Sequence, residues 1–327
     1  MATYKALRGV TIPTVAGDFS NIAVGDIWYN SVAKAIKVGQ TTAAAWASGG
    51  ALGTGRYVLA GAGTQTAGLA FGGAGSPVPS GGYKDETEEY NGSSWTESGD
   101  LTTARRSLSG AGTQTAGLAF GGYNGSTLNA TEEYGGASWT AGGNLTTARH
   151  SGGGLGTQTA GLAFGGSPAL NISEEYDGSS WAEGDNLNTA RHYLAGCGLQ
   201  TAGLAMGGYT GTAYTGATET YDGTSWTTAS GSFNTARSYG AGCGIQTAAV
   251  FFAGNVPGTS YLTITETYDG SSWTEVADLA TGRYGLAGAG TQAAGLAIAG
   301  RVSGGSVTTG AEEFTGEYAA AATVASS

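Results

Sequence analysis

The ten residues "TQTAGLAFGG" occur at 64–73, at 113–122 and at 157–166 without a single change. Degraded copies follow: "LQTAGLAMGG" at 199–208, "IQTAAVFFAG" at 245–254 and "TQAAGLAIAG" at 291–300. A phrase that returns at a nearly constant spacing indicates a repeat architecture, in which copies of one small unit stack on each other. The fold must therefore be sought in the repeating unit rather than in the 327 residues as a whole.

Each copy belongs to a longer unit with fixed landmarks. An Arg stands nine residues before the Gln of the phrase, and the last Gly stands eight residues after that Gln. A Glu-x-aromatic sequence follows, and in five copies a Trp lies five residues beyond the aromatic residue. Between them stand Asn-Gly, Gly-Gly or Asp-Gly pairs, which predict tight hairpin turns. The landmarks are Arg56, Arg105, Arg149, Arg191, Arg237 and Arg283, with Glu88, Glu132, Glu174, Glu219, Glu266 and Glu312.

The unit reads as four short strands. Strand a follows the Arg, strand b is the repeated phrase, strand c carries Glu-x-Tyr and strand d carries the Trp. Successive Arg landmarks are 42 to 49 residues apart, and a four-stranded unit of this length is typical of a propeller blade. The small residues of strands a and b suit the crowded centre, whereas Tyr and Trp suit the wider gaps between blades. We therefore expect an all-β propeller.

The order Arg, Gly-Gly, Glu-x-Tyr, Trp resembles the kelch motif and covers about residues 36–315. The resemblance implies a kelch-type β-propeller. Ala253 and Ala299 replace the first Gly of the pair in two copies, and we expect the backbone path to stay intact there.

The last copy has Ala319 where its Trp should stand, and a spare Trp46 lies ten residues before Arg56. Four of the other five Trp–Arg spacings are also ten residues. We infer that Trp46 lies on strand d of a sixth blade, so that residues 31–327 form a six-bladed ring without free sheet edges. The alternative is seven blades, with residues 25–46 as most of the seventh.

Residues 1–30 lie outside the repeats, and "GDIWYNSVAKAIKV" at 25–38 predicts a hairpin. A GD-x-WYN phrase followed by IKV resembles short segments near the start of tail-fibre and other virion proteins of tailed bacteriophages. The whole chain, with its nearly identical Gly-, Thr- and Ala-rich copies, resembles kelch-repeat structural proteins of marine phages. These resemblances imply that residues 1–30 anchor the chain to other virion proteins, and that several copies or a homo-oligomer sit on a particle.

The formal net charge is −11, and the six landmark Arg already account for almost half of the 13 basic residues. Lys5, Arg8, Lys34 and Lys37 lie near the N-terminus, which leaves Lys84, Arg106 and Arg301 on the propeller. We expect no nucleic-acid partner from so few cations. The start "MATYKALRGV" lacks the apolar segment of a secretory signal, and no apolar run approaches the ~18 residues of a membrane span, so we expect neither export nor membrane insertion.

Few residues suggest chemistry. A residue that recurs in every repeat serves what every repeat shares, so we interpret the landmark Arg and Glu as a structural pair. Cys197 and Cys243 stand where other copies have Ala or Leu, which favours buried inert thiols. His150 and His192 directly follow landmark Arg residues, and no third metal ligand is evident. We expect no metal, no cofactor, no catalytic residues and no enzyme activity.

The connections between strands b and c differ in length and content, and loops on a rigid scaffold often carry recognition. Their aromatic and amide side chains could stack on and hydrogen-bond a sugar, or they could merely cover that face. The candidate ligand-binding residues are Tyr83, Tyr123, Asn124, Tyr209, Tyr214 and Tyr261. The sequence thus favours a non-enzymatic virion protein (tail fibre, receptor-binding head or capsid decoration) that binds host-surface glycans. The alternatives are an intracellular kelch interaction module and a carbohydrate-active enzyme.

Overall fold

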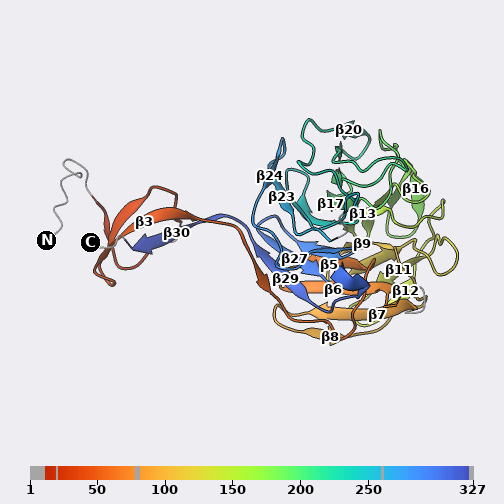
Figure 1. Cartoon of the computed structure of the whole chain (residues 1–327), viewed down its shortest axis with the longest axis horizontal. Coiled ribbons are helices and arrows are strands. Elements are labelled where there is room, and N and C mark those ends of the chain that lie inside the picture. Colours follow the sequence, from red (N-terminus) through yellow and green to blue (C-terminus); the bar gives the residue numbers. More distant parts are fainter. Residues whose placement is uncertain (1–11, 20, 78–81, 259–260, 324–327) are drawn as a thin grey trace. The chain divides into compact units, whose positions relative to one another are not determined.

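The computed structural model describes residues 12–19, 21–77, 82–258 and 261–323 (Figure 1). These residues form β-strands and turns, one short 3-10 helix at Ser303–Gly305 and no α-helix. The fold is therefore all-β and propeller-like, as the sequence predicts. Contacts divide the chain into two compact units: unit 1 comprises residues 1–45 and 316–327, and unit 2 comprises residues 46–315.

The described part of unit 2 contains six four-stranded sheets, one for each Arg-led repeat. The strands of the first three are, in sheet order, β5 (Ala60–Thr64), β6 (Ala67–Ala74), β7 (Tyr83–Tyr90) and β8 (Trp95–Glu97); β9 (Ser109–Gly112), β10 (Gly117–Phe120), β11 (Thr131–Tyr134) and β12 (Trp139–Ala141); β13 (Gly153–Thr157), β14 (Ala160–Phe164), β15 (Ser173–Tyr176) and β16 (Trp181–Glu183).

The fourth and fifth sheets continue the pattern, and the sixth takes its last strand from the start of the chain. Their strands are β17 (Ala195–Leu199), β18 (Ala202–Met206), β19 (Thr218–Tyr221) and β20 (Trp226–Thr228); β21 (Ala241–Ile245), β22 (Ala248–Phe252), β23 (Thr265–Tyr268) and β24 (Trp273–Glu275); β26 (Ala287–Gly290), β27 (Ala294–Ile298), β29 (Ala311–Thr315) and β4 (Ala45–Ser48). A separate pair, β25 (Arg283–Tyr284) and β28 (Arg301–Val302), adjoins the sixth sheet in sequence.

The turns between strands c and d form as the Asn-Gly and Asp-Gly pairs predict. In the third sheet, the Asp177 carboxylate accepts backbone N–H bonds from Ser179 (2.9 Å) and Ser180 (2.8 Å). Gly178 between them has φ +91°, a conformation that glycine adopts without strain. The side chain of the first turn residue and the flexibility of the second therefore fix the short hairpin between β15 and β16.

Trp46 takes the place of the missing sixth Trp. Its indole N–H donates to the Thr265 hydroxyl of the fifth sheet (3.0 Å), just as Trp139 of the second sheet donates to Thr87 of the first (2.9 Å). Its ring also contacts Phe252 and Phe314, with centroids 5.0 and 5.1 Å away. Strand β4 is thus the outer strand of the sixth sheet, in the position that the sequence predicts for it.

The landmark Arg and Glu form a buried ion pair inside each of the six sheets. In the fourth, Arg191 contacts Glu219 at 3.0 Å and donates to the backbone carbonyls of Gly207 (2.9 Å) and Ala217 (2.6 Å). The other oxygen of Glu219 accepts the N–H of Asn188 (2.7 Å), which lies three residues before the Arg. Each pair therefore joins the connection that precedes strand a to strands b and c, which is a structural arrangement.

The repeated Gln links each sheet to the preceding one. Gln114 donates two hydrogen bonds to the first sheet, to the carbonyls of Gly68 (3.1 Å) and Tyr90 (2.6 Å). Gln65 makes the same bonds to the sixth sheet, through Gly295 (3.1 Å) and Phe314 (2.7 Å). One amide thus satisfies a carbonyl on each of two neighbouring strands, which explains why the Gln recurs in every repeat.

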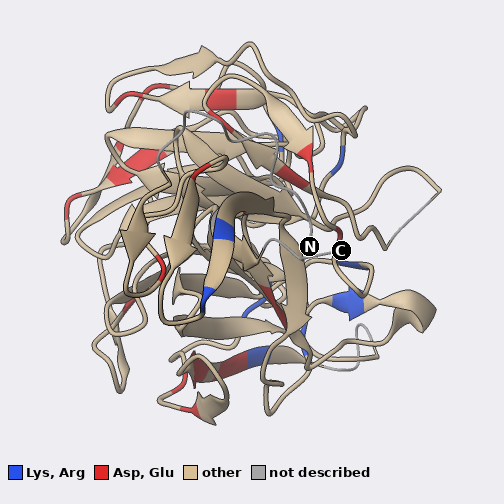
Figure 2. Cartoon of the chain, turned by 90° about the vertical axis from the view of Figure 1, so that its left-hand side faces the viewer, with Lys and Arg blue, Asp and Glu red and all other residues tan. Residues whose placement is uncertain are grey.

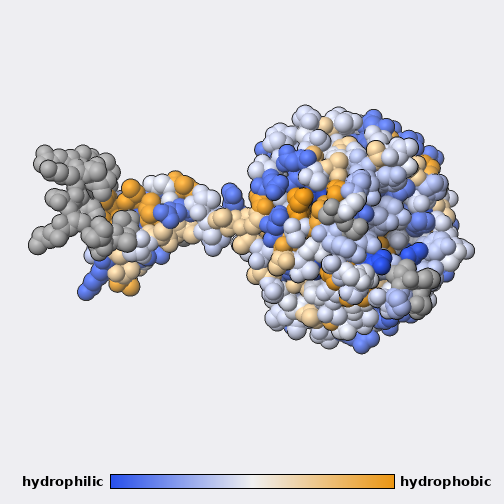
Figure 3. All heavy atoms as spheres, viewed as in Figure 1, coloured by the Kyte–Doolittle hydropathy of each residue, from blue (hydrophilic) through white to orange (hydrophobic). Residues whose placement is uncertain are grey.

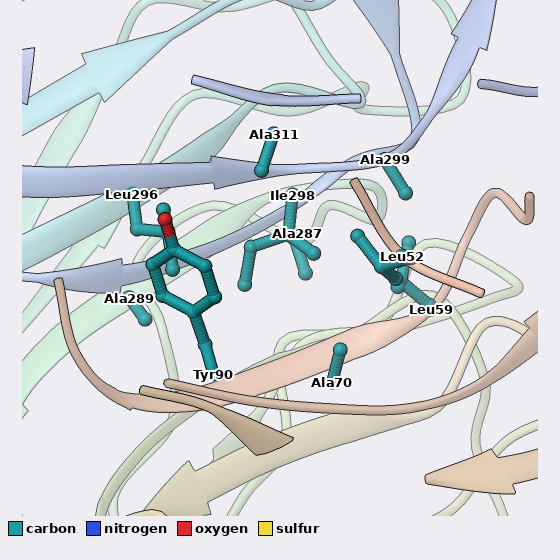
Figure 4. Close-up of a cluster of buried hydrophobic side chains, with 10 residues drawn as sticks. All are labelled: Leu52, Leu59, Ala70, Tyr90, Ala287, Ala289, Leu296, Ile298, Ala299 and Ala311. Carbon is teal, nitrogen blue, oxygen red and sulfur yellow. The ribbon is translucent and has the colours of Figure 1, made fainter. Parts of the chain in front are cut away.

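The first and sixth sheets also share an apolar core (Figure 4). Tyr90 and Leu59 of the first repeat pack against Leu296 and Ile298 of the last, and all four side chains are buried. Residues more than 200 positions apart in the sequence therefore bury each other's apolar surface, which stabilises unit 2 across the two ends of the repeat array.

Unit 1 contains a sheet in the order β1 (Thr14–Val15), β2 (Ile27–Asn30), β3 (Ala35–Thr42) and β30 (Tyr318–Thr323). The hairpin predicted at 25–38 is present as β2 and β3. Trp28 is fully buried, with its ring 4.9 Å from that of Phe19. The Asn30 carboxamide oxygen accepts the N–H of Val32 and of Ala33, which closes the turn of the hairpin.

The units differ from the division expected at residue 30. That boundary falls at the end of β2, inside the β2–β3 hairpin, and residues 318–323 pair with β3 rather than belonging to the repeat sheets. The segment 25–46 is likewise divided, because β2 and β3 lie in unit 1 whereas β4 lies in the sixth sheet. Residues 1–11 and 20 of the expected anchor lie outside the described residues.

Most of the surface of unit 2 that Figure 3 shows has intermediate hydropathy. On that face most atoms are pale, with smaller blue and orange areas. This agrees with a composition in which only 11% of residues are charged and 62 are Gly.

Candidate ligand-binding site

Two positions in each repeat meet where strand a begins and strand b ends: the residue after the landmark Arg, and the residue after the final Gly of the phrase. Antiparallel bridges hold the two together in all six repeats, so the backbone is constant while the side chains differ. We call these twelve residues the mouth. They are Tyr57 with Ala74, Arg106 with Tyr123, His150 with Ser167, His192 with Tyr209, Ser238 with Asn255, and Tyr284 with Arg301.

A chain of backbone hydrogen bonds joins the six repeats beside the mouth. The residue two positions after each landmark Arg donates its N–H to the carbonyl of the equivalent residue in the preceding repeat, and Val58 of the first repeat donates to Gly285 of the last. Each of these residues has φ between 47° and 62°. The six donors are Val58, Ser107, Ser151, Tyr193, Tyr239 and Gly285.

The left-handed backbone at these positions costs roughly 1–2 kcal/mol for each residue that carries a Cβ. Val58 and Tyr193 are among the five non-glycine residues that adopt it here. The conformation turns each N–H and C=O toward the neighbouring repeats, so the hydrogen bonds offset the strain. The result is a rigid floor beneath variable side chains.

A cavity of about 430 Å³ opens above this floor. Its volume falls in the range of small-molecule sites. Smaller cavities of about 90, 120 and 170 Å³ are lined by the innermost strands and the residues just before them. The lining of the large cavity is Tyr57, Val58, Arg106, Ser107, Tyr123, His150, Tyr193, Tyr239, Tyr284 and Arg301.

Aromatic rings form much of the wall. Tyr193 and Tyr239 are stacked, with centroids 3.6 Å apart and planes at 20°. Tyr239 meets Tyr284 edge-on at 5.6 Å, and Tyr284 meets Tyr57 edge-on at 6.5 Å. Burial, followed by the neighbouring tyrosines, raises the pKa of Tyr239. Burial also raises the pKa of Tyr284, so the hydroxyls of Tyr239 and Tyr284 are neutral near pH 7. A neutral tyrosine hydroxyl can both donate and accept a hydrogen bond.

Two cations stand in this wall. The guanidinium carbon of Arg106 lies 5.8 Å from the ring centroid of Tyr83 and 5.5 Å from that of Tyr123. Arg301 lies 5.7 Å from the ring of Tyr57 and donates to the Tyr284 hydroxyl (3.1 Å). Cation–π contacts of this kind position a guanidinium without neutralising it.

Neither cation has an acidic partner among the described residues. The six landmark Arg and Lys84 all form ion pairs, whereas Arg106 and Arg301 form none. The Nε of Arg106 is buried without a hydrogen-bond partner among those residues. The two unneutralised guanidiniums of unit 2 therefore line the same cavity.

Acidic residues are scarce around the mouth. The six sequence segments between strands b and c contain no Asp or Glu, and Asp85 and Glu86 lie within β7. Aspartates in the d–a connections bind backbone elsewhere: Asp100 accepts the N–H of Thr87 (3.1 Å), and Asp278 accepts that of Thr265 (3.2 Å). Figure 2 shows acidic residues spread over many strands and turns of the ribbon. The lining of the cavity contains no carboxylate, although the chain carries a net charge of −11.

The two histidines lie close to these groups. Burial and then the charge of Arg106 lower the pKa of His150, whose ring contacts that of Tyr123 at 5.4 Å. Burial and then His150 lower the pKa of His192, whose ring contacts Tyr209 at 5.5 Å. Both imidazoles are therefore neutral near pH 7 and add hydrogen-bonding groups rather than charge.

The structure brings three of the six predicted site residues to the cavity or its wall and places the other three outside its lining. Tyr123 lines the cavity, and Tyr83 and Tyr261 contact its wall, through Tyr123 (6.0 Å) and Tyr284 (5.7 Å) respectively. Tyr209 and Tyr214 contact each other at 5.1 Å beside His192, outside the lining. Asn124 is exposed, and its carboxamide oxygen accepts the N–H of Ser126 (3.4 Å).

Sequence reasoning did not single out most of the lining. Tyr57, Arg106 and Tyr284 directly follow landmark Arg residues, and Tyr193 and Tyr239 are one position further on. The signal was available, because these are variable positions inside an otherwise constant frame. The b–c connections vary in both length and content, whereas the lining residues depart from the repeated frame only by single substitutions.

The two cysteines are buried and chemically inert. Cys197 and Cys243 are free and buried, and burial raises the pKa of both thiols, that of Cys243 to about 12. Within the described ranges, no group of three or more His, Cys, Asp or Glu is arranged to hold a metal ion. The same part of the chain contains no helix with the length and hydropathy needed to cross a membrane.

Comparison with known proteins gave no match, either to a protein-family model or to a curated protein sequence.

Proposed function

We propose that unit 2 is a six-bladed, kelch-type β-propeller whose ring is closed by β4. Three contacts between the first and last repeats support this: the hydrogen bond from Val58 to Gly285, the bonds from Gln65 to the sixth sheet, and the shared apolar core. Equivalent backbone and Gln hydrogen bonds occur between all consecutive repeats, and similar apolar cores join the consecutive repeats from the first to the fifth. A closed ring leaves no unpaired inner edge for another chain to extend.

We further propose that the chain is a non-enzymatic binding protein of a tailed-phage virion, which displays unit 2 toward surface ligands of the host. The observation that carries the binding role is the mouth, where constant backbone positions carry different side chains and six of the twelve residues line one cavity. Variable side chains on a constant frame are the arrangement that recognition requires. The virion assignment rests on the resemblance of the N-terminal phrase and of the repeats to phage structural proteins.

Unit 1 is the proposed attachment to the particle. Its exposed side chains include Val24 (62% exposed) and Val32 (73% exposed), which lie near and within the hairpin that carries the GD-x-WYN phrase. Apolar side chains exposed to this degree are available for burial against another protein. Several copies on one particle would then present several mouths, which raises the avidity for a surface that repeats its ligand.

The test is a reconstruction of purified phage particles by electron microscopy, with mass spectrometry of the same preparation. We expect the chain among the structural proteins, with unit 1 against capsid or tail and the mouth facing outward. Particles that lack the chain would overturn the virion assignment. An affinity purification that instead recovers one intracellular protein partner in stoichiometric amount would support the interaction-module alternative.

A further inference from the structure

We propose that the mouth binds an acidic sugar, with the carboxylate of the sugar held by Arg106 and its ring placed against the tyrosines of the cavity. This inference rests on the proposed binding role and names the class of ligand. It starts from the two guanidiniums of unit 2 that have no acidic partner among the described residues, both of which line this cavity.

Electrostatics selects an anion. A guanidinium in a wall without carboxylates attracts negative charge and repels cations, and the partial exclusion of water strengthens that attraction. Arg106 presents a planar guanidinium that forms no ion pair with the described residues, and its two terminal nitrogens can donate two parallel bonds to one carboxylate. Arg301 is less free, because it already donates to Gly305 (3.0 Å) and to Tyr284 (3.1 Å). Arg106 is therefore the principal anion-binding group.

The rest of the wall selects a sugar. Tyr123 lies beside Arg106, and Tyr57, Tyr193, Tyr239 and Tyr284 line the same cavity. Aromatic surface suits the apolar face of a pyranose ring, and tyrosine hydroxyls, which can donate and accept hydrogen bonds, suit its hydroxyl groups. The cavity is compact, and its floor is the backbone ring rather than an open groove, which favours a single ring over an extended peptide.

The test is isothermal titration calorimetry of the full chain with two pairs of sugars that differ in acidity: methyl glucuronide against methyl glucoside, and sialyllactose against lactose. At least one acidic sugar should bind about tenfold or more tightly than its neutral partner, which corresponds to one charge-assisted contact. Arg106→Ala should remove that preference, and Arg106→Lys should retain part of it. Raising the salt concentration should lower the affinity for the acidic sugar and leave that for its neutral partner unchanged.

Lys84→Ala is the matched control. Lys84 lies on β7, its charge is neutralised by Glu86 (2.7 Å), and it does not line the cavity. This variant should leave the affinity unchanged. If Arg106→Ala fails to fold, Tyr123→Ala provides a second test. Loss of this aromatic ring should lower the affinity for acidic and neutral sugars together.

Three results would overturn the inference: equal affinity for acidic and neutral sugars, no binding of any of the four, or tighter binding of a tetraglutamate peptide that competes at the mouth. The proposed function fails separately. If particles lack the chain but the chain binds acidic sugars through Arg106, the virion role is wrong and the ligand proposal stands. If particles carry the chain but adsorb to the host equally well with Arg106→Ala, the virion role stands and the acidic sugar is not the host ligand.

Discussion

At the scale of single residues, unit 2 is stabilised by groups that each satisfy several partners in a buried position. Arg191 binds one carboxylate and two carbonyls, and Glu219 in turn accepts backbone and side-chain N–H groups from Asn188. A buried charge is tolerated only when it is both paired and hydrogen-bonded. Losing either partner should therefore cost more than losing a typical surface pair.

We expect Arg191→Met to lower the free energy of unfolding by about 3–5 kcal/mol, because Glu219 is left buried without its counter-charge. The double variant Arg191→Met/Glu219→Leu should recover part of this loss. Urea unfolding followed by circular dichroism would measure both. Lys84→Met is the matched comparison, since the partly exposed Lys84–Glu86 pair should contribute about 1 kcal/mol or less. Equal effects at the two sites would contradict the argument.

The tyrosines of strand c predict how stability changes at alkaline pH. Tyr134 and Tyr176 donate to Glu89 and Glu133 of the preceding sheets, and burial followed by these hydrogen bonds raises the pKa of each hydroxyl to about 12. The pKa of an unfolded tyrosine is about 10. A folded pKa above the unfolded one gives stabilisation that is complete below about pH 10 and is lost as the pH rises toward about 12.

The wild-type free energy of unfolding should therefore fall more steeply between about pH 10 and about pH 12 than that of Tyr134→Phe/Tyr176→Phe, which cannot ionise there. Urea titrations at half-unit pH steps would show the difference. Parallel curves for the two proteins would mean that these hydroxyls do not contribute to the pH dependence.

At the scale of elements, the sixth sheet is informative because it joins strands from the two ends of the chain. Strand β4 makes the same contact with the fifth sheet that β12 makes with the first, through Trp46 and Thr265 in one case and Trp139 and Thr87 in the other. If β4 is an outer strand like the others, these two pairs should be energetically equivalent.

Double-mutant cycles would test this equivalence. We expect Trp46→Phe with Thr265→Val to give a coupling energy of about 1 kcal/mol, close to that of Trp139→Phe with Thr87→Val, because each cycle removes one indole–hydroxyl hydrogen bond. Urea unfolding of the single and double variants supplies the coupling energies. Coupling at Trp139 without coupling at Trp46 would show that β4 does not hold its place in solution.

At the scale of the whole molecule, the two units should lose structure independently. Deletion of residues 318–327 removes β30 and leaves the backbone groups of β3 without that partner. We expect the amides of β3 to exchange faster with deuterium and those of β6 to keep their protection, because the contacts of β6 lie within unit 2. Hydrogen–deuterium exchange read by mass spectrometry would resolve the two. Loss of protection in both would contradict the division into units.

Most of unit 2 was predictable because its information is local and repeated. The Asp-Gly turns, the Arg and Glu landmarks and the spacing of Trp46 each follow from a pattern that recurs within about 50 residues. Ala253 and Ala299 also behave as expected, with φ of 62° and 56°, close to the 65° of Gly72 in the first repeat.

Other features carry no local signal. Strand β30 is a run of alanines with no alternation of polar and apolar residues, and its partner β3 lies about 280 positions earlier. The hydrogen-bonded residues beside the mouth that adopt a positive φ include Val58, Ser107 and Tyr193. Such residue types rarely adopt a positive φ, so the sequence does not predict it, and only the hydrogen bonds to neighbouring repeats make it favourable. The lining of the cavity was missed for a related reason, because it is assembled from one or two residues of several repeats.

The pairing of β3 with β30 has a mechanical consequence. Unit 2 begins at Trp46 and ends at Thr315, and both of its ends continue into strands of the same small sheet. Unit 2 is therefore connected to unit 1 by two covalent segments of the chain, so a force pulling the units apart is shared between them. A protease that cuts one segment leaves unit 2 connected through the other, and release requires a second cut.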